Sequence, residues 1–237
     1  MRKTLSKGIA IRKTSYWSKK EVEMILKESN TPVLNGLVLA GGKSKRMGTN
    51  KDLIKWHGKA QRYHVADMLK KFCKEVFISC RQEQVKEFNP AYKSLPDTFL
   101  NMGPFGGILS ALQAEKDKAW LVIACDLPLL NEETIQFLVD NRDPQKSATT
   151  YESPFDGLPE PLMTIWEPRC YSTLLDFLEK GITSPRKVLL SSDETLILKS
   201  SNPEALINVN TPEDLAQVKK ILSAGIYGSS SISNNHS

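Results

Sequence analysis

The sequence lacks the patterns that mark disulfide-linked, zinc-binding and membrane-spanning proteins. Its four cysteines form no Cys-x-x-Cys pair, and its three histidines have no metal-ligand spacing with the cysteines or with one another. No run approaches the roughly 18 consecutive apolar residues that a membrane helix requires. We therefore expect no disulfide framework, no zinc site and no transmembrane segment.

A basic surface is missing from most of the chain, and so is a secretory signal. Residues 1–34 carry eight Lys or Arg and three Glu, which accounts for the whole net charge of +5, whereas residues 35–237 balance to zero. This distribution gives poor support to nucleic-acid binding. The basic N-terminus has no apolar core of the signal-peptide kind, so we expect a cytoplasmic protein without a nucleic-acid or membrane partner. A transit peptide stays open, because a basic, acid-free N-terminus also fits one.

Two common phosphate-binding motifs are also absent. The segment Gly42-Lys43-Ser44 has the form of a P-loop end, but that motif requires a glycine at position 37, where Leu37 stands. No GxGxxG pattern accompanies the strand expected before this segment. The sequence therefore predicts neither a P-loop NTPase nor a dinucleotide-binding enzyme of the usual kind.

What the chain does have is an alternation of short apolar runs and helical patterns. Apolar runs predict strands at residues 35–40, 76–80, 120–125, 148–151, 162–166, 195–198 and 206–209. Helical patterns fall at residues 62–72, 105–114, 132–140 and 168–180. Such alternation is typical of a three-layer α/β/α fold with a mostly parallel, Rossmann-like sheet.

The two ends of the chain differ from this core. Thr211-Pro212-Glu213-Asp214 predicts the start of a terminal helix, with Thr as N-cap, Pro in the first position and acids in the first turn. We predict a basic N-terminal extension at 1–34 with a helical pattern at 18–28, one domain at 35–224, and a disordered tail rich in Gly, Ser and Asn at 225–237.

The most distinctive segment is Leu39–Lys51, which follows the first strand. Adjacent Gly41 and Gly42 let the backbone approach a ligand closely, and the N–H groups of such a loop form an anion-binding nest. Three cations, Lys43, Arg46 and Lys51, add positive charge for phosphate oxygens. A solvated basic turn would have the same composition, so the loop alone leaves both interpretations open.

Two aspartates and two asparagines stand where a site is expected. Asp126 follows an apolar strand, so its carboxylate should reach the carboxyl edge of the sheet, where magnesium prefers oxygen ligands. Asp97 precedes a glycine-containing loop. Asn208 and Asn210 alternate around Val209 in an expected strand and should share one face. Simpler interpretations are a turn at Asp126, an Asx turn at Asp97 and a helix lead-in at Asn210.

Five separated blocks in this order resemble the molybdenum cofactor guanylyltransferases, a branch of the NTP transferases with a LAGGxSxRMGxxK-like signature. The blocks are residues 39–51, Asp97 with 103–107, 125–128 (CDLP), 160–162 (EPL) and 208–214 (NVNTPED). The resemblance covers about residues 35–222. It implies a fold of the nucleotide-diphospho-sugar transferase type and a magnesium-dependent enzyme that transfers GMP from GTP to molybdopterin, with a protein partner in cofactor delivery.

The resemblance also implies roles for individual residues. The implied nucleotide-binding residues are Leu39, Ala40, Gly41, Gly42, Lys51, Ser79, Asp97 and Asp126. The implied catalytic residues are Lys51, Arg46 and Asp126, the metal ligands Asp126 and Asn210, and the acceptor-binding residues Asn208 and Asn210. Ser79 departs from the pattern, because many members have Asn at this strand end.

Three alternatives remain at this point. The phosphate loop and Asp126 serve every NTP transferase, so a cytidylyltransferase or a sugar-phosphate nucleotidyltransferase stays open. Paired Gly41-Gly42 and the late NVNTPED block favour the molybdenum branch, because cytidylyltransferases more often have Ala at the second position. The third alternative is a nucleotide-binding regulatory module without turnover, against which Lys51 and Asp126 argue.

Overall fold

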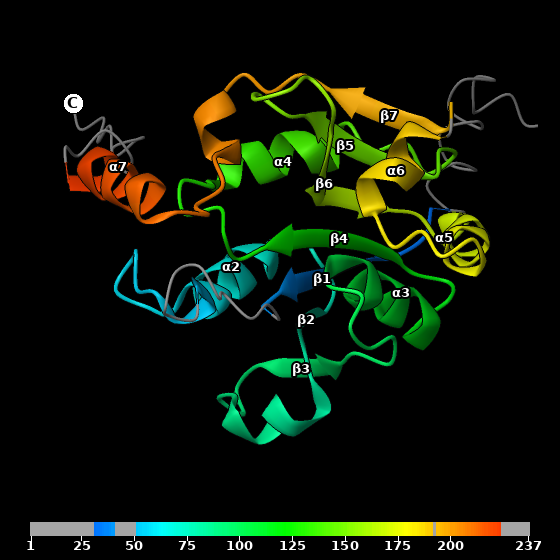
Figure 1. Ribbon diagram of the computed structural model, residues 1–237, viewed down its shortest axis with the longest axis horizontal. Coiled ribbons are helices and arrows are strands. Elements are labelled where there is room, and N and C mark those ends of the chain that lie inside the picture. Colours follow the sequence, from blue (N-terminus) through cyan, green and yellow to red (C-terminus); the bar gives the residue numbers. More distant parts are fainter. Residues whose placement is uncertain (1–30, 41–50, 192, 224–237) are drawn as a thin grey trace, which may run out of the picture. The chain divides into compact units, whose positions relative to one another are not determined.

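The computed structural model describes residues 31–40, 51–191 and 193–223 (Figure 1). The chain divides into two compact units, Met1–Thr31 and Pro32–Ser237, and every element below belongs to the second. The predicted helix at 18–28, most of the predicted extension and the predicted tail lie outside the described residues. None of the described helices is long and apolar enough to cross a membrane.

A seven-stranded sheet of order β3-β2-β1-β4-β6-β5-β7 forms the centre of this unit. Its strands are β1 (Leu34–Leu39), β2 (Val76–Cys80), β3 (Lys93–Pro96), β4 (Ala119–Ala124), β5 (Ala148–Glu152), β6 (Pro159–Trp166) and β7 (Thr195–Leu198). Within the described sheet, β6 runs antiparallel to both of its neighbours, and the remaining pairs are parallel. The predicted mostly parallel sheet is therefore confirmed.

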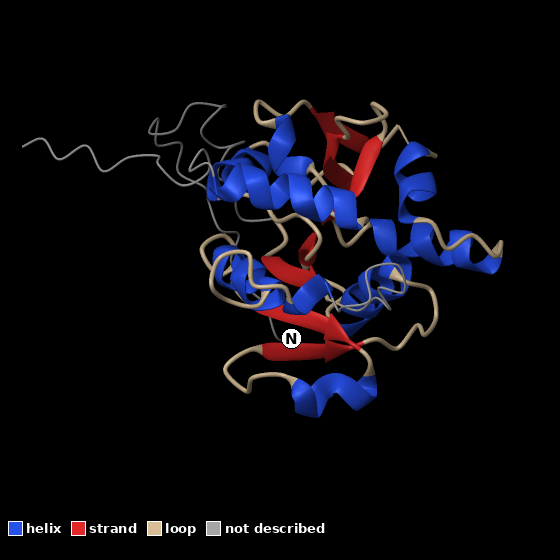
Figure 2. Cartoon of the chain, turned by 60° about the vertical axis from the view of Figure 1, so that its left-hand side comes forward, coloured by secondary structure: helices blue, strands red, loops and turns tan. Residues whose placement is uncertain are grey.

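Helices cover both faces of the sheet (Figures 1 and 2). One apolar core packs α2 (Gln61–Leu69) and α4 (Glu132–Asp140) against the sheet, and the other packs α3 (Pro104–Ala114), α5 (Cys170–Glu179) and α6 (Pro185–Leu190) against the opposite face. Alternate residues of β1 point to different cores, Val38 to the first and Leu37 to the second. Central strands buried on both faces are what a three-layer α/β/α fold requires, so this prediction is confirmed.

Several predicted elements have the observed bounds, and others do not. The strands at 76–80 and 195–198 and the helix at 132–140 are confirmed to the residue. The sequence patterns missed the short edge strand β3 and helix α6. The predicted strand at 206–209 is wrong, because Leu206 ends a 3-10 helix, η3 (Pro203–Leu206), and the chain then continues as an irregular segment.

The terminal helix α7 (Pro212–Ser223) begins where its capping residues predicted. The Asp214 N–H donates to Thr211 Oγ1 over 3.2 Å, and the Asp214 carboxylate accepts from the N–H groups of Thr211 and Asn210. The side chains of Thr211 and Asp214 thus each accept a hydrogen bond from the backbone N–H of the other, as in a capping box. This cap fixes the segment that carries the two predicted asparagines.

Candidate active site

The carboxyl ends of four neighbouring parallel strands meet at one edge of the sheet. Leu39 ends β1 and pairs in register with Ser79 of β2 and with Ala124 of β4. Asp97 follows β3, and Asp126 follows β4 after one intervening residue. The structure therefore brings Leu39, Ala40, Ser79, Asp97 and Asp126 to one edge. Three predicted residues, Gly41, Gly42 and Arg46, lie outside the described residues.

The Asp126 carboxylate lies in an unusual environment for a charged group. Its Oδ1 is shielded from solvent and has no hydrogen-bond partner among the described residues. Burial raises the pKa of Asp126, while the positive charge of Lys51 opposes this shift. A buried carboxylate oxygen without a donor is costly for the fold, and such costs concentrate at functional sites.

Lys51 connects the start of the domain with its end. It begins the 3-10 helix η1 (Lys51–Leu53), and its Nζ donates to Asn210 Oδ1 over 2.8 Å. The loop carrying Asn210 is held against this edge of the sheet because the Val209 N–H donates to the Asp126 carbonyl over 2.9 Å. The structure thus gathers Lys51, Asp126 and Asn210 from segments that lie far apart in the sequence.

The two predicted asparagines do not lie on one face of a strand, because no strand forms there. Asn210 is exposed, and its side-chain oxygen accepts from Lys51. Asn208 is partly buried, and its Oδ1 is shielded from solvent without a hydrogen-bond partner among the described residues. The asparagine with an uncommitted oxygen is therefore Asn208, whereas the expected metal ligand was Asn210.

The segment between η1 and α2 is attached to the loop that follows Asp126. His57 Nε2 donates to the Pro128 carbonyl over 2.9 Å, and Gln61 Nε2 donates to the Leu127 carbonyl over 3.3 Å. A buried ion pair between Arg62 and Asp52, 2.9 Å long, closes the segment on itself. These contacts attach the segment that begins at Lys51 to the loop that follows Asp126, and so hold Lys51 near Asp126.

The Ser79 hydroxyl donates to Asp97 Oδ1 over 2.8 Å. Burial raises the pKa of the Asp97 carboxyl, and this hydrogen bond opposes the rise. Gly107, in the first turn of α3, faces both side chains. A Cβ at position 107 would stand 3.0 Å from Ser79 Oγ and 3.6 Å from Asp97 Oδ1. A side chain at position 107 would therefore crowd the Ser79 hydroxyl, whereas its distance from Asp97 would be an ordinary contact.

The sequence patterns missed a further carboxylate at this edge. Glu160 is 2% exposed at the start of β6, and its pKa is raised by burial and by the charge of Asp126, with Arg186 opposing. Arg186 Nη2 stands 3.7 Å from Glu160, and its Nη1 lies 2.6 Å from Asp156. The acid within the EPL block was the signal that pointed to this position.

Two threonine hydroxyls fix the backbone at Glu160. Thr150 Oγ1 and Thr164 Oγ1 each donate to the Glu160 carbonyl over 2.7 Å. The pairing of β5 with β6 shifts register beside this point, between Thr150 and Glu152. A register shift of this kind redirects a side chain at the end of a sheet, and here it accompanies the carboxylate that lies near Asp126.

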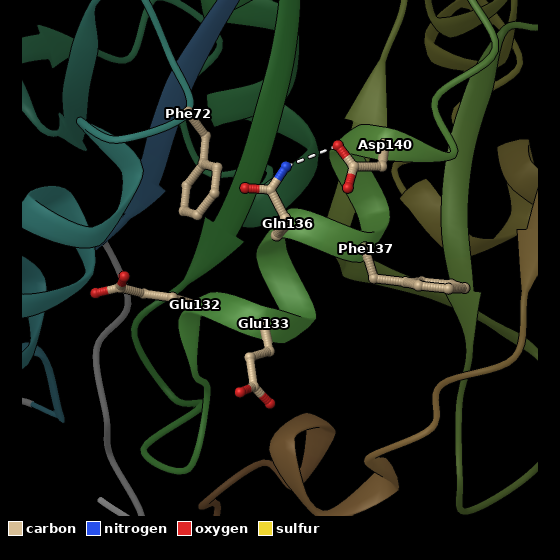
Figure 3. Close-up of a pocket in the computed structure, with 6 residues that line it drawn as sticks. All are labelled: Phe72, Glu132, Glu133, Gln136, Phe137 and Asp140. Carbon is tan, nitrogen blue, oxygen red and sulfur yellow. Dashed lines mark hydrogen bonds between the residues drawn. The ribbon is translucent and has the colours of Figure 1, made fainter. Parts of the chain in front are cut away.

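A hollow of about 460 Å³ lies elsewhere, along α4 and the end of α2 (Figure 3). It is lined by Phe72, Glu132, Glu133, Gln136, Phe137 and Asp140. Gln136 and Asp140 bond to each other over 2.7 Å. No predicted site residue lines this hollow, and the partnerless oxygens of Asp126 and Asn208 are not part of it. The carboxyl edge of the sheet is therefore the candidate site.

Comparison with known proteins agrees with this geometry. Residues 36–195 match the MobA-like NTP transferase domain. A molybdenum cofactor biosynthesis bifunctional protein of Synechocystis is 36% identical over 92% of this chain, which spans 62% of that protein's length. A probable molybdenum cofactor guanylyltransferase of Nostoc is 34% identical, covering 78% of this chain and 90% of its own.

The fold is also similar to that of a solved structure from this group of proteins. The crystal structure of molybdopterin-guanine dinucleotide biosynthesis protein A from Archaeoglobus fulgidus superposes with a TM-score of 0.67 at 22% identity, covering 80% of this chain and 99% of its own. At that identity the likeness concerns the fold, which is that of the nucleotidyltransferases. Sequence and structure together show that the chain belongs to the MobA-like NTP transferases, in the molybdenum cofactor guanylyltransferase family.

Proposed function

We propose that this protein transfers GMP from GTP to the phosphate of molybdopterin and releases pyrophosphate. The observation that carries the proposal is the grouping of Asp126, Lys51 and Asn210 at the carboxyl edge, where α/β proteins bind nucleotides. The name of the Nostoc relative supports the same chemistry, and that of the Synechocystis relative supports a role in molybdenum cofactor biosynthesis. A cytoplasmic location and a protein partner in cofactor delivery stay predictions.

The reaction needs no protein nucleophile. An oxygen of the acceptor phosphate forms a bond to the α-phosphorus of GTP, the bond to the β-phosphate oxygen breaks, and pyrophosphate leaves with that electron pair. Catalysis then consists of holding two polyanions in line and stabilising the developing charge. Lys51 supplies a positive charge beside Asp126. By the family resemblance, Arg46 would join Lys51 in stabilising the developing charge, and the amides of the Gly41-Gly42 loop would bind the departing pyrophosphate.

A magnesium ion fits the side chains at this edge. Asp126 and Asn208 each present a side-chain oxygen that is shielded from solvent and has no partner among the described residues, and magnesium prefers oxygen ligands. Asp126 would hold the ion, with an amide oxygen from Asn208 or, once Lys51 moves to a phosphate, from Asn210. Bound there, magnesium would supply positive charge at the α-phosphate.

The two substrates would occupy different halves of the edge. Asp97 and Ser79 lie at the ends of β3 and β2, on the side that the resemblance assigns to the nucleotide. Glu160 and Arg186 lie on β6 and α6, on the other side of Asp126. We assign the molybdopterin phosphate to this second side, and the family resemblance implies that Asn208 would contact the acceptor.

The deciding experiment is pyrophosphate release with molybdopterin, magnesium and each of the four NTPs, together with calorimetry of each nucleotide. GTP is expected to bind at least about tenfold tighter than CTP, ATP or UTP, which is within reach of one buried hydrogen bond. Equal or tighter binding of CTP would favour a cytidylyltransferase. Binding without release from any NTP would favour a regulatory module.

A further inference from the structure

The Asp97 backbone is fixed on both sides. Its N–H donates to the Cys80 carbonyl over 2.8 Å, which continues the pairing of β3 with β2 by one residue. The next N–H, that of Thr98, donates to Ser110 Oγ of α3 over 2.8 Å. Because the backbone is held at both positions, the remaining freedom of Asp97 is rotation of its side chain.

Ser79 removes this rotation. Ser79 is 2% exposed at the end of β2, and its hydroxyl donates to Asp97 Oδ1 over 2.8 Å. Among the described residues, Ser79 provides the side-chain hydrogen bond to this carboxylate. A short hydrogen bond to an ionised acceptor is among the stronger kinds, so one carboxylate oxygen is held and the other is left for a ligand.

The Ser79 hydroxyl itself is enclosed. A Cβ at position 107 would meet Leu39 Cδ2 at 2.8 Å and Ser79 Oγ at 3.0 Å, whereas Asp97 Oδ1 would be 3.6 Å away. The α3 backbone therefore passes directly over the hydroxyl. The Ser79 side chain is short and enclosed, so the group of this pair that can reach a ligand is the Asp97 carboxylate.

We propose that Ser79 is a positioning residue that sets base selectivity through Asp97 and does not itself contact the nucleotide. By holding Oδ1, it turns Oδ2 toward a base that offers two adjacent N–H donors, as the ring N1–H and 2-amino group of guanine do. Preorganising an acceptor in this way lowers the ordering cost of binding. This inference rests on the proposed function, because it assumes that a purine nucleotide occupies the edge beside Asp97.

The test compares GTP with ITP, which keeps the ring N–H but lacks the 2-amino group. Dissociation constants are measured by calorimetry with magnesium for the parent protein and for Ser79→Ala. The parent is expected to bind GTP about tenfold tighter than ITP, which is the scale of one buried hydrogen bond. Ser79→Ala should weaken GTP about tenfold and ITP much less, so that the preference falls to about twofold or lower.

Two further variants separate positioning from folding. Ser153→Ala removes another buried serine hydroxyl, which bonds to a backbone N–H in the other half of the sheet, and should leave the GTP-to-ITP ratio unchanged. Gly107→Ala keeps the Ser79 hydroxyl but inserts a methyl group beside it, and should lower the same ratio. Thermal melting of each variant with and without GTP shows whether the fold persists.

A ratio that stays at the parent value in folded Ser79→Ala would overturn the inference, and so would equal binding of GTP and ITP by the parent. In kinetics, the expected effect is a raised KM for GTP with kcat nearly unchanged. Failure of the proposed function would look different. In that case the parent would release no pyrophosphate with molybdopterin, while the calorimetric ratio would still report on Ser79.

Discussion

The two halves of the sheet reach the candidate site in opposite ways. In β3, β2, β1 and β4 the chain runs toward the site, and each strand ends at or near a side chain that lies there. On the other side of β4, β6 runs away from the site and begins there with Glu160. The first half therefore offers loops that can wrap around a ligand, whereas β6 offers a side chain anchored within a strand.

The buried carboxylates of the two halves, Asp126 and Glu160, also differ in their hydrogen bonds. Beside β4, Asp126 Oδ1 has no partner among the described residues. In the β6 half, the Glu160 carbonyl accepts from two threonine hydroxyls, and its carboxylate accepts from the Leu162 N–H over 3.0 Å. A buried carboxylate oxygen without a donor is available to a ligand or a metal ion, whereas the Glu160 carboxylate is already held by a backbone N–H. The predictions below test this division.

The half of the sheet formed by β3, β2, β1 and β4 is called the nucleotide half below, after the substrate proposed for it. The largest effect is expected from removing the charges of this half. Asp126→Asn and Lys51→Met should each lower turnover at least about 100-fold, the scale on which a single charge-stabilising group acts in catalysis. Pyrophosphate release measures this. Since burial raises the pKa of Asp126, its charged form is disfavoured in the fold, so Asp126→Asn should melt at the same or a higher temperature at pH 7.

Lys55→Met is the matched control for Lys51→Met, because it removes an exposed lysine four residues away in the same segment. Its turnover should stay within about twofold of the parent, as expected for a surface change away from the site. Equal losses in the two lysine variants would mean that the segment is sensitive as a whole and that Lys51 has no special role.

A smaller but clear effect is expected from Gly106→Ala in the first turn of α3. Helix propensity alone would make alanine the more stable residue by about 1 kcal/mol. A Cβ at position 106, however, would stand 2.2 Å from the Phe99 carbonyl oxygen, which is backbone and cannot rotate away. We expect a net loss of about 2 kcal/mol, as is usual for forced overpacking.

Urea unfolding of Gly106→Ala gives the sign directly. Ala114→Gly, at the exposed end of the same helix, is the control and should lose about 1 kcal/mol or less from propensity alone. A stabilised Gly106→Ala protein would show that the approach of the helix to the Phe99 carbonyl relaxes easily and does not constrain the site.

In each half of the sheet, sequence patterns predicted some elements to the residue and missed others. The helix at 132–140 and the strand at 195–198 were predictable, because the apolar residues of the helix recur with the helical period and those of the strand form a short apolar run. Strand β3 was missed because Lys93 and Ser94 break the apolar run and Pro96 disfavours a strand. Helix α6 had a readable start, with Ser184 as N-cap and Pro185 after it, but only one short turn-and-a-half of helix follows.

The sequence predicted which residues reach the edge of the sheet, and it did not predict which of them contact one another. A strand followed by Asp126 places a carboxylate at the sheet edge in any fold of this class. The contact of Lys51 with Asn210 spans 159 residues, and no local pattern records it. The predicted strand at 206–209 failed for the same reason, because Val209 bonds to the loop at Asp126 and joins no sheet. Tertiary contacts decided both outcomes.

A still smaller effect concerns pH and is confined to the nucleotide half. The rings of His57 and His64 stack with centroids 4.1 Å apart, and burial, followed by the charge of His57, lowers the pKa of His64 to about 4. The folded protein thus binds this proton less readily than the unfolded chain does. The contribution of His64 to stability is complete above about pH 6.5 and is lost as the pH falls toward 4.

His64→Gln should therefore flatten part of the pH dependence between 4 and 6.5. The free energy of unfolding is measured in urea at pH 7 and pH 5. Its decrease should be smaller in the variant than in the parent by about 1 kcal/mol, after allowance for partial exposure of the ring. Identical decreases in both proteins would show that other groups carry the acid sensitivity of this half.

The smallest effect is expected on the other side of Asp126. Glu160→Gln keeps the size of the side chain and its acceptor for the Leu162 N–H but removes the charge that faces Arg186. Arg186 lies closer to Asp156, at 2.6 Å, than to Glu160, at 3.7 Å, so it should stay near its place. Because a negative charge beside the phosphate is removed while the arginine stays, we expect the KM for molybdopterin to fall about threefold, which is roughly 0.7 kcal/mol, with the KM for GTP unchanged.

A change in the KM for molybdopterin without a change in the KM for GTP would show that the two halves of the sheet bind different substrates. Asp156→Asn is the matched control, because it neutralises the exposed partner of the same arginine, and an exposed ion pair contributes at most about 1 kcal/mol. If Glu160→Gln lowered the KM for GTP as much as the KM for molybdopterin, the buried carboxylate would act on both substrates through Asp126, whose charge already raises the pKa of Glu160. The site would then be one electrostatic unit, and β6 would belong to the nucleotide half despite its direction.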